Sequence, residues 1–104
     1  VSATAVDSPT AGSASYAAAK AAAETWMRAL AHGFGKDQKA GGTGALRSAA
    51  VVFVVKALVD AGMRAAEPER GFAGYTDVGT LAAAVVELFA TDAAELNGTR
   101  RKLA

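Results

Sequence analysis

Residues 49–55 form one unbroken apolar run, Ala49-Ala50-Val51-Val52-Phe53-Val54-Val55, and this run decides the fold. It has no polar side chain, and β-branched valines make up most of it. A strand with one face in water alternates polar and apolar residues, whereas a strand buried on both faces is apolar throughout. The run therefore predicts an inner strand of a parallel sheet that is covered by helices on both faces.

The residues before and after this run predict further strands and helices, which alternate along the chain. We expect a strand over residues 1–6 and a helix over 15–32. After an irregular segment at 57–75, we expect a second helix over 78–89 and a final strand over 99–104. Alanines and other strong helix formers fill the first helix, and turn residues separate the elements.

This order of strand, helix, strand, helix and strand predicts an α/β fold with right-handed crossovers. The expected architecture is the C-terminal half of a Rossmann-type doubly wound parallel sheet, with about three parallel strands and two main helices. Residues 36–47 are expected to form a polar connector. Because a parallel sheet needs more strands to hide both faces, we expect the N-terminal, cofactor-binding half of such a domain to be absent from residues 1–104.

The composition excludes several classes of protein. With 52% hydrophobic and 20% charged residues, the chain is expected to form one globular unit. Its net charge of +1 favours neither nucleic acid nor anionic lipid as a partner, and no apolar run approaches the roughly 20 residues that span a bilayer. One histidine, His32, and no cysteine leave no ligand set for a metal site, and the lack of cysteine favours a cytoplasmic location.

The residues most suited to chemistry are Tyr16 and Lys20, in the first turns of the predicted helix. Side chains four residues apart lie one above the other on a helix. An ammonium group beside a phenol favours the phenolate, so the tyrosine can exchange a proton with a substrate oxygen as a general acid/base. The spacing alone also fits a solvated surface pair.

The surroundings of this pair resemble the active-site helix of short-chain dehydrogenases/reductases. The stretch that carries the resemblance is SASYAAAKAAAE, residues 13–24, continued by Arg28-Ala29-Leu30-Ala31. The resemblance runs on through the apolar run to Glu95-Leu96-Asn97-Gly98, which is similar to the turn before the family's last strand, so essentially the whole chain is covered. It implies an oxidoreductase that transfers a hydride between NAD or NADP and a carbonyl or quinonoid imine substrate.

The resemblance implies a role for each matching residue. Tyr16 would donate the proton to the substrate oxygen, and Lys20 would assist it and hydrogen-bond the nicotinamide ribose, so that both residues contact the cofactor. The family's serine, which orients the substrate carbonyl, falls at Ala3 here. Ser2 and Thr4 flank that position, and Thr4 is the better replacement because it lies nearer the following loop; in the alternative, neither residue acts.

The missing serine and the segment after the apolar run are similar to the dihydropteridine reductase-like branch of the family. The matching residues of that segment are Met63-Arg64, Glu67-Pro68, Phe72 and Tyr75-Thr76. A pteridine-like substrate is therefore one candidate. The glycine-rich turn that holds the cofactor phosphates in this family has no counterpart in residues 1–104, so the chain alone is expected to be inactive as a reductase.

A second hypothesis is a non-catalytic fragment or assembly module. Its basis is the flat, alanine-rich helix over 15–32, which in this family packs against a second subunit and so implies a homodimer or homotetramer. Trp26 and Leu30 on that helix are interpreted as core or subunit contacts. The basic run Arg100-Arg101-Lys102 is interpreted as a solvated strand end.

Overall fold

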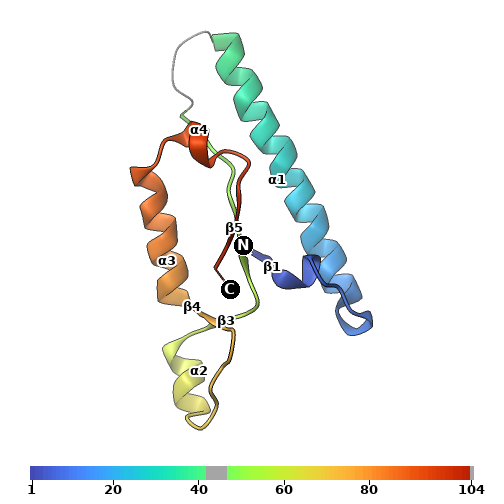
Figure 1. The fold of residues 1–104 in the computed structure, drawn as a ribbon, viewed down its shortest axis with the longest axis vertical. Helices are drawn as coiled ribbons and strands as arrows, with labels where there is room; N and C mark the ends of the chain where they lie inside the picture. Colours follow the sequence, from blue (N-terminus) through green and yellow to red (C-terminus); the bar gives the residue numbers. More distant parts are fainter. Residues whose placement is uncertain (42–46, 104) are drawn as a thin grey trace.

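The computed structural model describes residues 1–41 and 47–103 (Figure 1). The strands in these ranges are β1 (Ser2–Ala3), β2 (Val52–Val55), β3 (Leu58–Val59), β4 (Thr76–Asp77) and β5 (Arg100–Lys102). The α-helices are α1 (Ala14–Gly41), α2 (Ala61–Ala66), α3 (Val78–Glu87) and α4 (Ala93–Leu96). Short 3₁₀ turns are η1 (Thr4–Val6), η2 (Ala11–Ser13) and η3 (Leu88–Ala90).

The main sheet contains β1, β2 and β5 in that order, and all its strands are parallel. Val54 of the middle strand β2 lies opposite Ser2 on one side and Lys102 on the other. All of β2 is buried, and Val54 is buried completely. The prediction of an α/β fold with an inner parallel strand within residues 49–55 is therefore confirmed, while the finer assignment to half of a Rossmann-type sheet stays a prediction.

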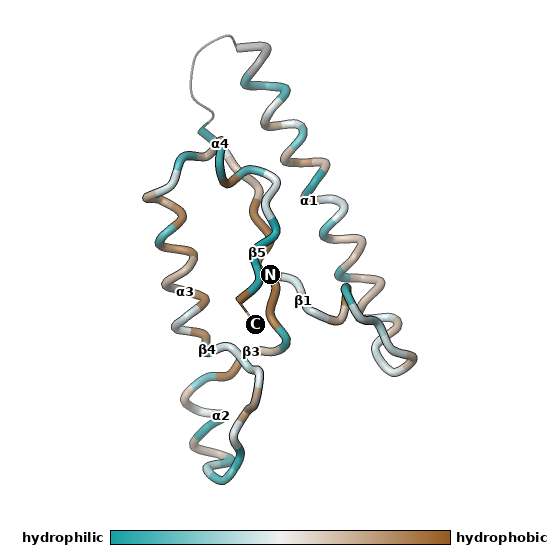
Figure 2. The backbone as a smooth tube through the Cα atoms, viewed as in Figure 1, coloured by the Kyte–Doolittle hydropathy of each residue, from teal (hydrophilic) through white to brown (hydrophobic). Residues whose placement is uncertain are grey.

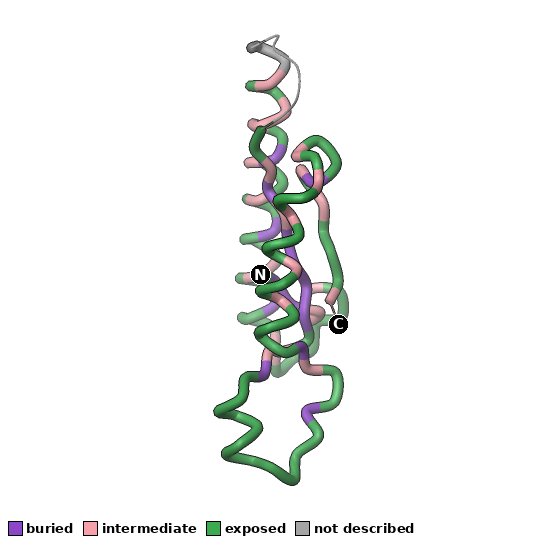
Figure 3. Tube along the Cα trace, turned by 90° about the vertical axis from the view of Figure 1, so that its left-hand side faces the viewer, coloured by how far each residue is buried: buried purple, intermediate pink, exposed green. Residues whose placement is uncertain are grey.

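The sheet lies between α1 on one face and α3 on the other (Figure 1, Figure 3). Val52 and Arg100 line a cavity together with residues of α1, whereas their neighbours Phe53 and Arg101 line one together with residues of α3. Since successive residues of a strand point to opposite faces, these contacts place the two helices on opposite faces of the sheet.

The two crossovers differ in hand. From β1 to β2 to β5 the chain moves in one direction across the sheet, so helices on opposite faces give one right-handed and one left-handed connection. The expectation that both crossovers are right-handed is therefore wrong. The preference for right-handed crossovers describes two parallel strands joined by one crossover segment. The connection from β2 to β5 is longer, because β3, α2 and β4 precede α3.

The helix predicted over 15–32 is longer than expected and continues to Gly41. Gly33 and Gly35 lie within the helix, and neither has the positive φ of a glycine cap. A glycine with helical φ lowers helix stability by roughly 1 kcal/mol relative to alanine without stopping the helix. The predicted connector at 36–47 is therefore helical up to Gly41, and residues 42–46 lie outside the described residues.

The first and last strands are shorter than predicted. β1 ends at Ala3, opposite Val55, the last residue of β2. The neighbouring strand offers no further ladder partner beyond that point, and the chain turns into η1 at Thr4. β5 likewise is only Arg100–Lys102, within the predicted 99–104.

Asn97 joins three parts of the fold through its side-chain amide. The amide oxygen accepts a hydrogen bond of 3.0 Å from the backbone nitrogen of Ala50, just before β2. The amide nitrogen donates one of 2.8 Å to the backbone oxygen of Ala31 on α1. The next residue, Gly98, has a φ of 80°, a conformation that glycine adopts without strain.

Replacing this amide is expected to destabilise the protein measurably. Asn97→Ala removes both hydrogen bonds and leaves the Ala50 nitrogen without its partner, so the free energy of unfolding should fall by about 1–3 kcal/mol. Urea unfolding followed by circular dichroism measures this loss. Thr25→Ala serves as the control, because Thr25 is an exposed residue that bonds only Arg28 in the described residues. Equal unfolding midpoints for Asn97→Ala and the wild type would contradict the bridging role.

Candidate functional site

Tyr16 and Lys20 lie together on the first turns of α1, as their spacing predicts. The Lys20 Nζ atom is 5.8 Å from the centroid of the Tyr16 ring. The same nitrogen donates a hydrogen bond of 3.1 Å to the backbone oxygen of Val1. Tyr16 is 54% exposed and Lys20 is half-buried, so the phenol is accessible to a small molecule.

The residues around position 3 differ in burial and in their contacts. Ala3 is buried in β1, and Ser2 beside it is also buried. The Ser2 hydroxyl donates a hydrogen bond of 2.5 Å to Glu24 on α1, so it faces away from the side on which Ala3 lies. Thr4 is half-buried at the start of η1. Of the two hydroxyls that sequence reasoning left open, that of Ser2 is therefore already engaged inside the protein.

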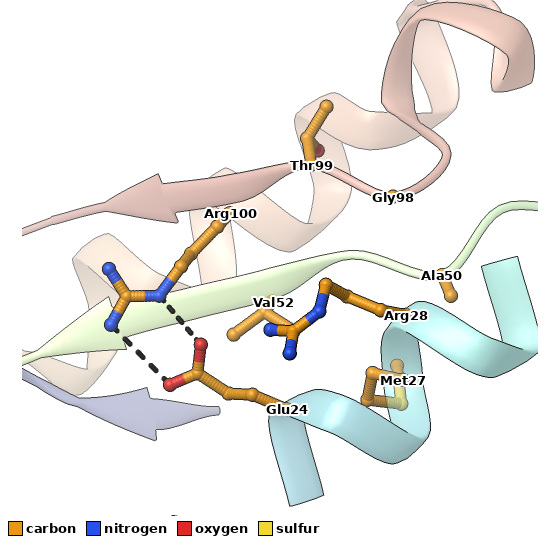
Figure 4. A pocket seen from close by; sticks show the side chains of 8 residues that line it. All are labelled: Glu24, Met27, Arg28, Ala50, Val52, Gly98, Thr99 and Arg100. Atoms are coloured by element: carbon orange, nitrogen blue, oxygen red, sulfur yellow. Dashed lines mark hydrogen bonds and ion pairs between the residues drawn. The ribbon is translucent and has the colours of Figure 1, made fainter. Parts of the chain in front are cut away.

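A network of charged groups next to this site was missed by the sequence analysis. Arg100 reaches from β5 across β2 to Glu24 on α1 (Figure 4). Its Nε lies 2.6 Å from Glu24 Oε1, and its terminal nitrogens lie 3.1 and 3.2 Å from the two carboxylate oxygens of Asp7. Lys102 adds a contact of 3.3 Å to Asp7. Residues 100–102 are exposed, as expected of a solvated strand end, but the Arg100 side chain, 29% exposed, is also engaged in ion pairs that this interpretation did not include.

Hydrogen bonds and charges in this network favour the ionised forms of its members. The Arg100 guanidinium, aided by the Ser2 hydroxyl, lowers the pKa of Glu24 against the opposing effect of burial. The same guanidinium and Lys102 lower the pKa of Asp7. In return, the carboxylates of Glu24 and Asp7 raise the pKa of Arg100. The network is therefore a fully charged arrangement of two carboxylates and two cations at neutral pH.

Acid is expected to destabilise the protein through Glu24. Because its pKa is lower in the folded state, the folded state binds fewer protons, and stability is present above the unfolded glutamate pKa of roughly 4.3 and lost as the pH falls through the lowered value. Urea unfolding at pH 7 and pH 3 should show this decrease. Glu24→Gln cannot titrate, so its stability should change less between the two pH values; an equal change in both proteins would contradict the assignment.

A small cavity lies beneath α1 beside the network. Its volume is about 40 Å³, close to the roughly 30 Å³ that one water molecule occupies in the liquid. Glu24, Arg28 and Arg100 provide its polar lining, and Val52 and Met27 are among its apolar residues. Neither Tyr16 nor Lys20 lines this cavity, and neither lines the larger ones of about 480 and 320 Å³ beside α3.

The segment after β2, which resembles the dihydropteridine reductase-like branch, forms a lobe of its own. β3 and β4 pair in parallel at its base, where Val59 is fully buried. At its tip the ring of Phe72 packs edge-on against Tyr75 at 5.4 Å, and the Arg70 guanidinium lies 4.7 Å from the Phe72 ring centroid. Phe72 is buried, whereas the surrounding lobe is exposed (Figure 3). The backbone φ of Phe72 is 50°.

Phe72 is therefore held in a conformation that costs a non-glycine residue of order 1–3 kcal/mol. Arg70 stabilises it from one side and also bonds the Tyr75 hydroxyl at 3.0 Å and Glu67 at 3.0 Å. Glu67 raises the pKa of Arg70, so this cation stays charged. At the tip of the lobe, Arg70 joins the two aromatic residues by stacking on the Phe72 ring and bonding the Tyr75 hydroxyl.

Within the described residues, no helix is both long and apolar enough to cross a membrane. The same residues include no group of three His, Cys, Asp or Glu side chains that is placed to hold a metal ion. No protein-family model matches the chain, and comparisons with curated proteins and with solved structures likewise return no match.

Proposed function

We propose that this chain is the catalytic and substrate-side half of an NAD(P)-dependent short-chain oxidoreductase. The observation that supports the proposal is the pair of Tyr16 and Lys20 on one face of α1, with an exposed phenol and an ammonium 5.8 Å from its ring. The proposed substrate is a small molecule with a carbonyl group or, as in a pteridine, a quinonoid imine.

The residues of α1 fit a nicotinamide ribose as a partner. An ammonium group carries three hydrogens, and in the described part of the chain Lys20 gives one of them to the Val1 oxygen. The others can reach the hydroxyls of a ribose, and the Tyr16 hydroxyl lies on the same open face. When bound, the cofactor supplies a hydride.

The role of this chain in the proposed reaction is proton transfer. As the substrate carbon accepts a hydride, its double-bond electron pair moves to the oxygen or nitrogen, and Tyr16 gives its hydroxyl proton to that atom. The Lys20 ammonium stabilises the phenolate that remains. In the reverse direction the phenolate takes the proton back, so one residue serves as acid and as base.

The proposal is tested with the protein encoded by the complete open reading frame. Oxidation of NADH and of NADPH is followed at 340 nm with a panel of aldehydes, ketones and a quinonoid dihydropterin, and transfer of deuterium from labelled cofactor is followed by mass spectrometry. Cofactor-dependent reduction with deuterium in the product supports the proposal. A protein that binds neither cofactor would contradict it.

A second candidate function is assembly through α1 without catalysis. Trp26 on this helix is 65% exposed although it is the largest apolar side chain of the chain, and the alanines around it are exposed as well. An exposed tryptophan on a flat helix is typical of a surface that another protein covers. The resemblance to the enzyme family implies a second copy of the chain as that partner, in a homodimer or homotetramer.

Trp26→Ala is expected to weaken such an assembly. Interface tryptophans contribute about 2 kcal/mol or more, so the dissociation constant should rise by roughly 30-fold or more. Sedimentation equilibrium of the wild type and the variant measures the change. Phe89→Ala is the matched control, because Phe89 is an aromatic residue that is 90% exposed but lies beyond α3, on the other face of the sheet. A wild type that stays monomeric at all concentrations would exclude assembly.

A further inference from the structure

The face of α1 that packs on the sheet is nearly smooth. Its buried residues in the described part are Ala17, Glu24 and Ala31, which follow one another at intervals of seven. Helices and sheets hold their relative position when large side chains fit between those of the neighbouring layer. Two alanine methyl groups and the half-buried Met27 provide little of this, so apolar packing alone holds α1 only weakly in position on the sheet.

Glu24 supplies the fixed position that the alanines lack. Its carboxylate accepts hydrogen bonds from Ser2 on β1 and from Arg100 on β5, at 2.5 and 2.6 Å. These two strands lie on either side of β2, so one side chain of α1 is bonded to both edge strands of the sheet. Figure 4 shows the contact with Arg100. The carboxyl side chain is only 5% exposed, which strengthens both bonds by keeping water away.

Tyr16, Lys20 and Glu24 follow one another at intervals of four along α1. A helix rises 1.5 Å and turns by about 100° per residue, so a shift of α1 at Glu24 displaces the other two residues by a similar amount. Lys20 bonds the oxygen of Val1, just before β1, and Glu24 bonds the next residue, Ser2, so these two contacts fix α1 against the start of β1.

We propose that Glu24 is a positioning residue for Tyr16 and Lys20, and that Arg100 is its partner on the last strand. This inference rests on the proposed function of the pair. The Glu24 carboxylate sets the position of α1 along the sheet and thereby the place of the phenol relative to a substrate. The contact with Ser2 has a second effect: it engages the Ser2 hydroxyl inside the protein, so that Ser2 does not replace the serine of the related family.

The test compares Glu24→Ala, Glu24→Gln, Arg100→Ala and the double variant Glu24→Ala/Arg100→Ala in the protein from the complete reading frame. A displacement of about 1 Å in a catalytic group can lower the rate by roughly 10²-fold, so kcat should fall by that order in Glu24→Ala, while KM for the cofactor stays within about two-fold. Glu24→Gln keeps the shape of the side chain and should recover most of the rate. The double variant should be no slower than the worse single one.

The control is Arg28→Gln, which removes a charge one turn further along the same helix; Arg28 bonds only Thr25 in the described residues. It should leave kcat unchanged. If Glu24→Ala does not fold, the kcat of Arg100→Ala decides the inference. Unchanged kcat in every Glu24 and Arg100 variant, together with an inactive Tyr16→Phe, would overturn the positioning role alone. Full activity of Tyr16→Phe would instead overturn the proposed function.

Discussion

Tyr16→Phe is expected to lower the turnover of the protein from the complete reading frame by about 10²–10⁴-fold, the usual contribution of a general acid/base. Phenylalanine keeps the ring, whose face lies 5.8 Å from the Lys20 nitrogen, and removes only the hydroxyl. Cofactor affinity should therefore change little. Steady-state kinetics gives the rate, and quenching of protein fluorescence by added NADH or NADPH gives the affinity.

Tyr75→Phe is the matched control for this substitution, because it removes the same hydroxyl from the only other tyrosine of the chain. The Tyr75 hydroxyl is bonded to Arg70 in the lobe after β2, and its loss should alter stability slightly without a 10²-fold loss of rate. Equal losses in the two variants would mean that a tyrosine hydroxyl matters for structure rather than for proton transfer.

Glu24→Ala is expected to destabilise the protein by about 3 kcal/mol, the largest loss that we expect from a single polar substitution. The variant removes one member of a buried ion pair and leaves Arg100 with Asp7 alone, and it also leaves the Ser2 hydroxyl without its acceptor. The buried Ser2 hydroxyl is then without a partner away from water, which costs more than the intact contact contributes.

Chemical denaturation at pH 7 measures this loss, and Glu69→Ala provides the comparison. Glu69 is exposed in the lobe after β2, and substitutions at such positions usually change the free energy of unfolding by less than about 0.5 kcal/mol. A Glu24→Ala variant as stable as Glu69→Ala would show that the contact between α1 and β5 contributes nothing to the fold.

Short sequence patterns predicted those features of the fold that depend only on residues near one another in the chain. The apolar run around Val54 indicated a buried parallel strand, because only a strand covered on both faces lacks polar alternation. The spacing of Tyr16 and Lys20 placed both on one side of α1, because helical geometry brings residues four apart together. Both features follow from a few neighbouring residues, whatever the rest of the chain does.

Features that depend on distant residues were missed. Arg100 lies 76 residues from Glu24, and the two meet only because β5 pairs with β2 on the side away from β1. The one available signal was a glutamate at the interval of Tyr16 and Lys20, on the buried side of an alanine-rich helix, where a charge needs a partner. The hand of the second crossover was equally out of reach, because it depends on how the lobe between β2 and α3 packs.

The basic sequence of β5 also bears on how copies of this protein can meet. β5 is an edge strand in the described sheet, and an edge with free backbone groups invites another strand to pair with it. Its residues are Arg100, Arg101 and Lys102, all cationic and all facing solvent in part. If the β5 edges of two copies came together, like charges would lie side by side. This repulsion disfavours the joining of sheets into fibrils or open chains. Salt screens the charges and should therefore weaken the repulsion.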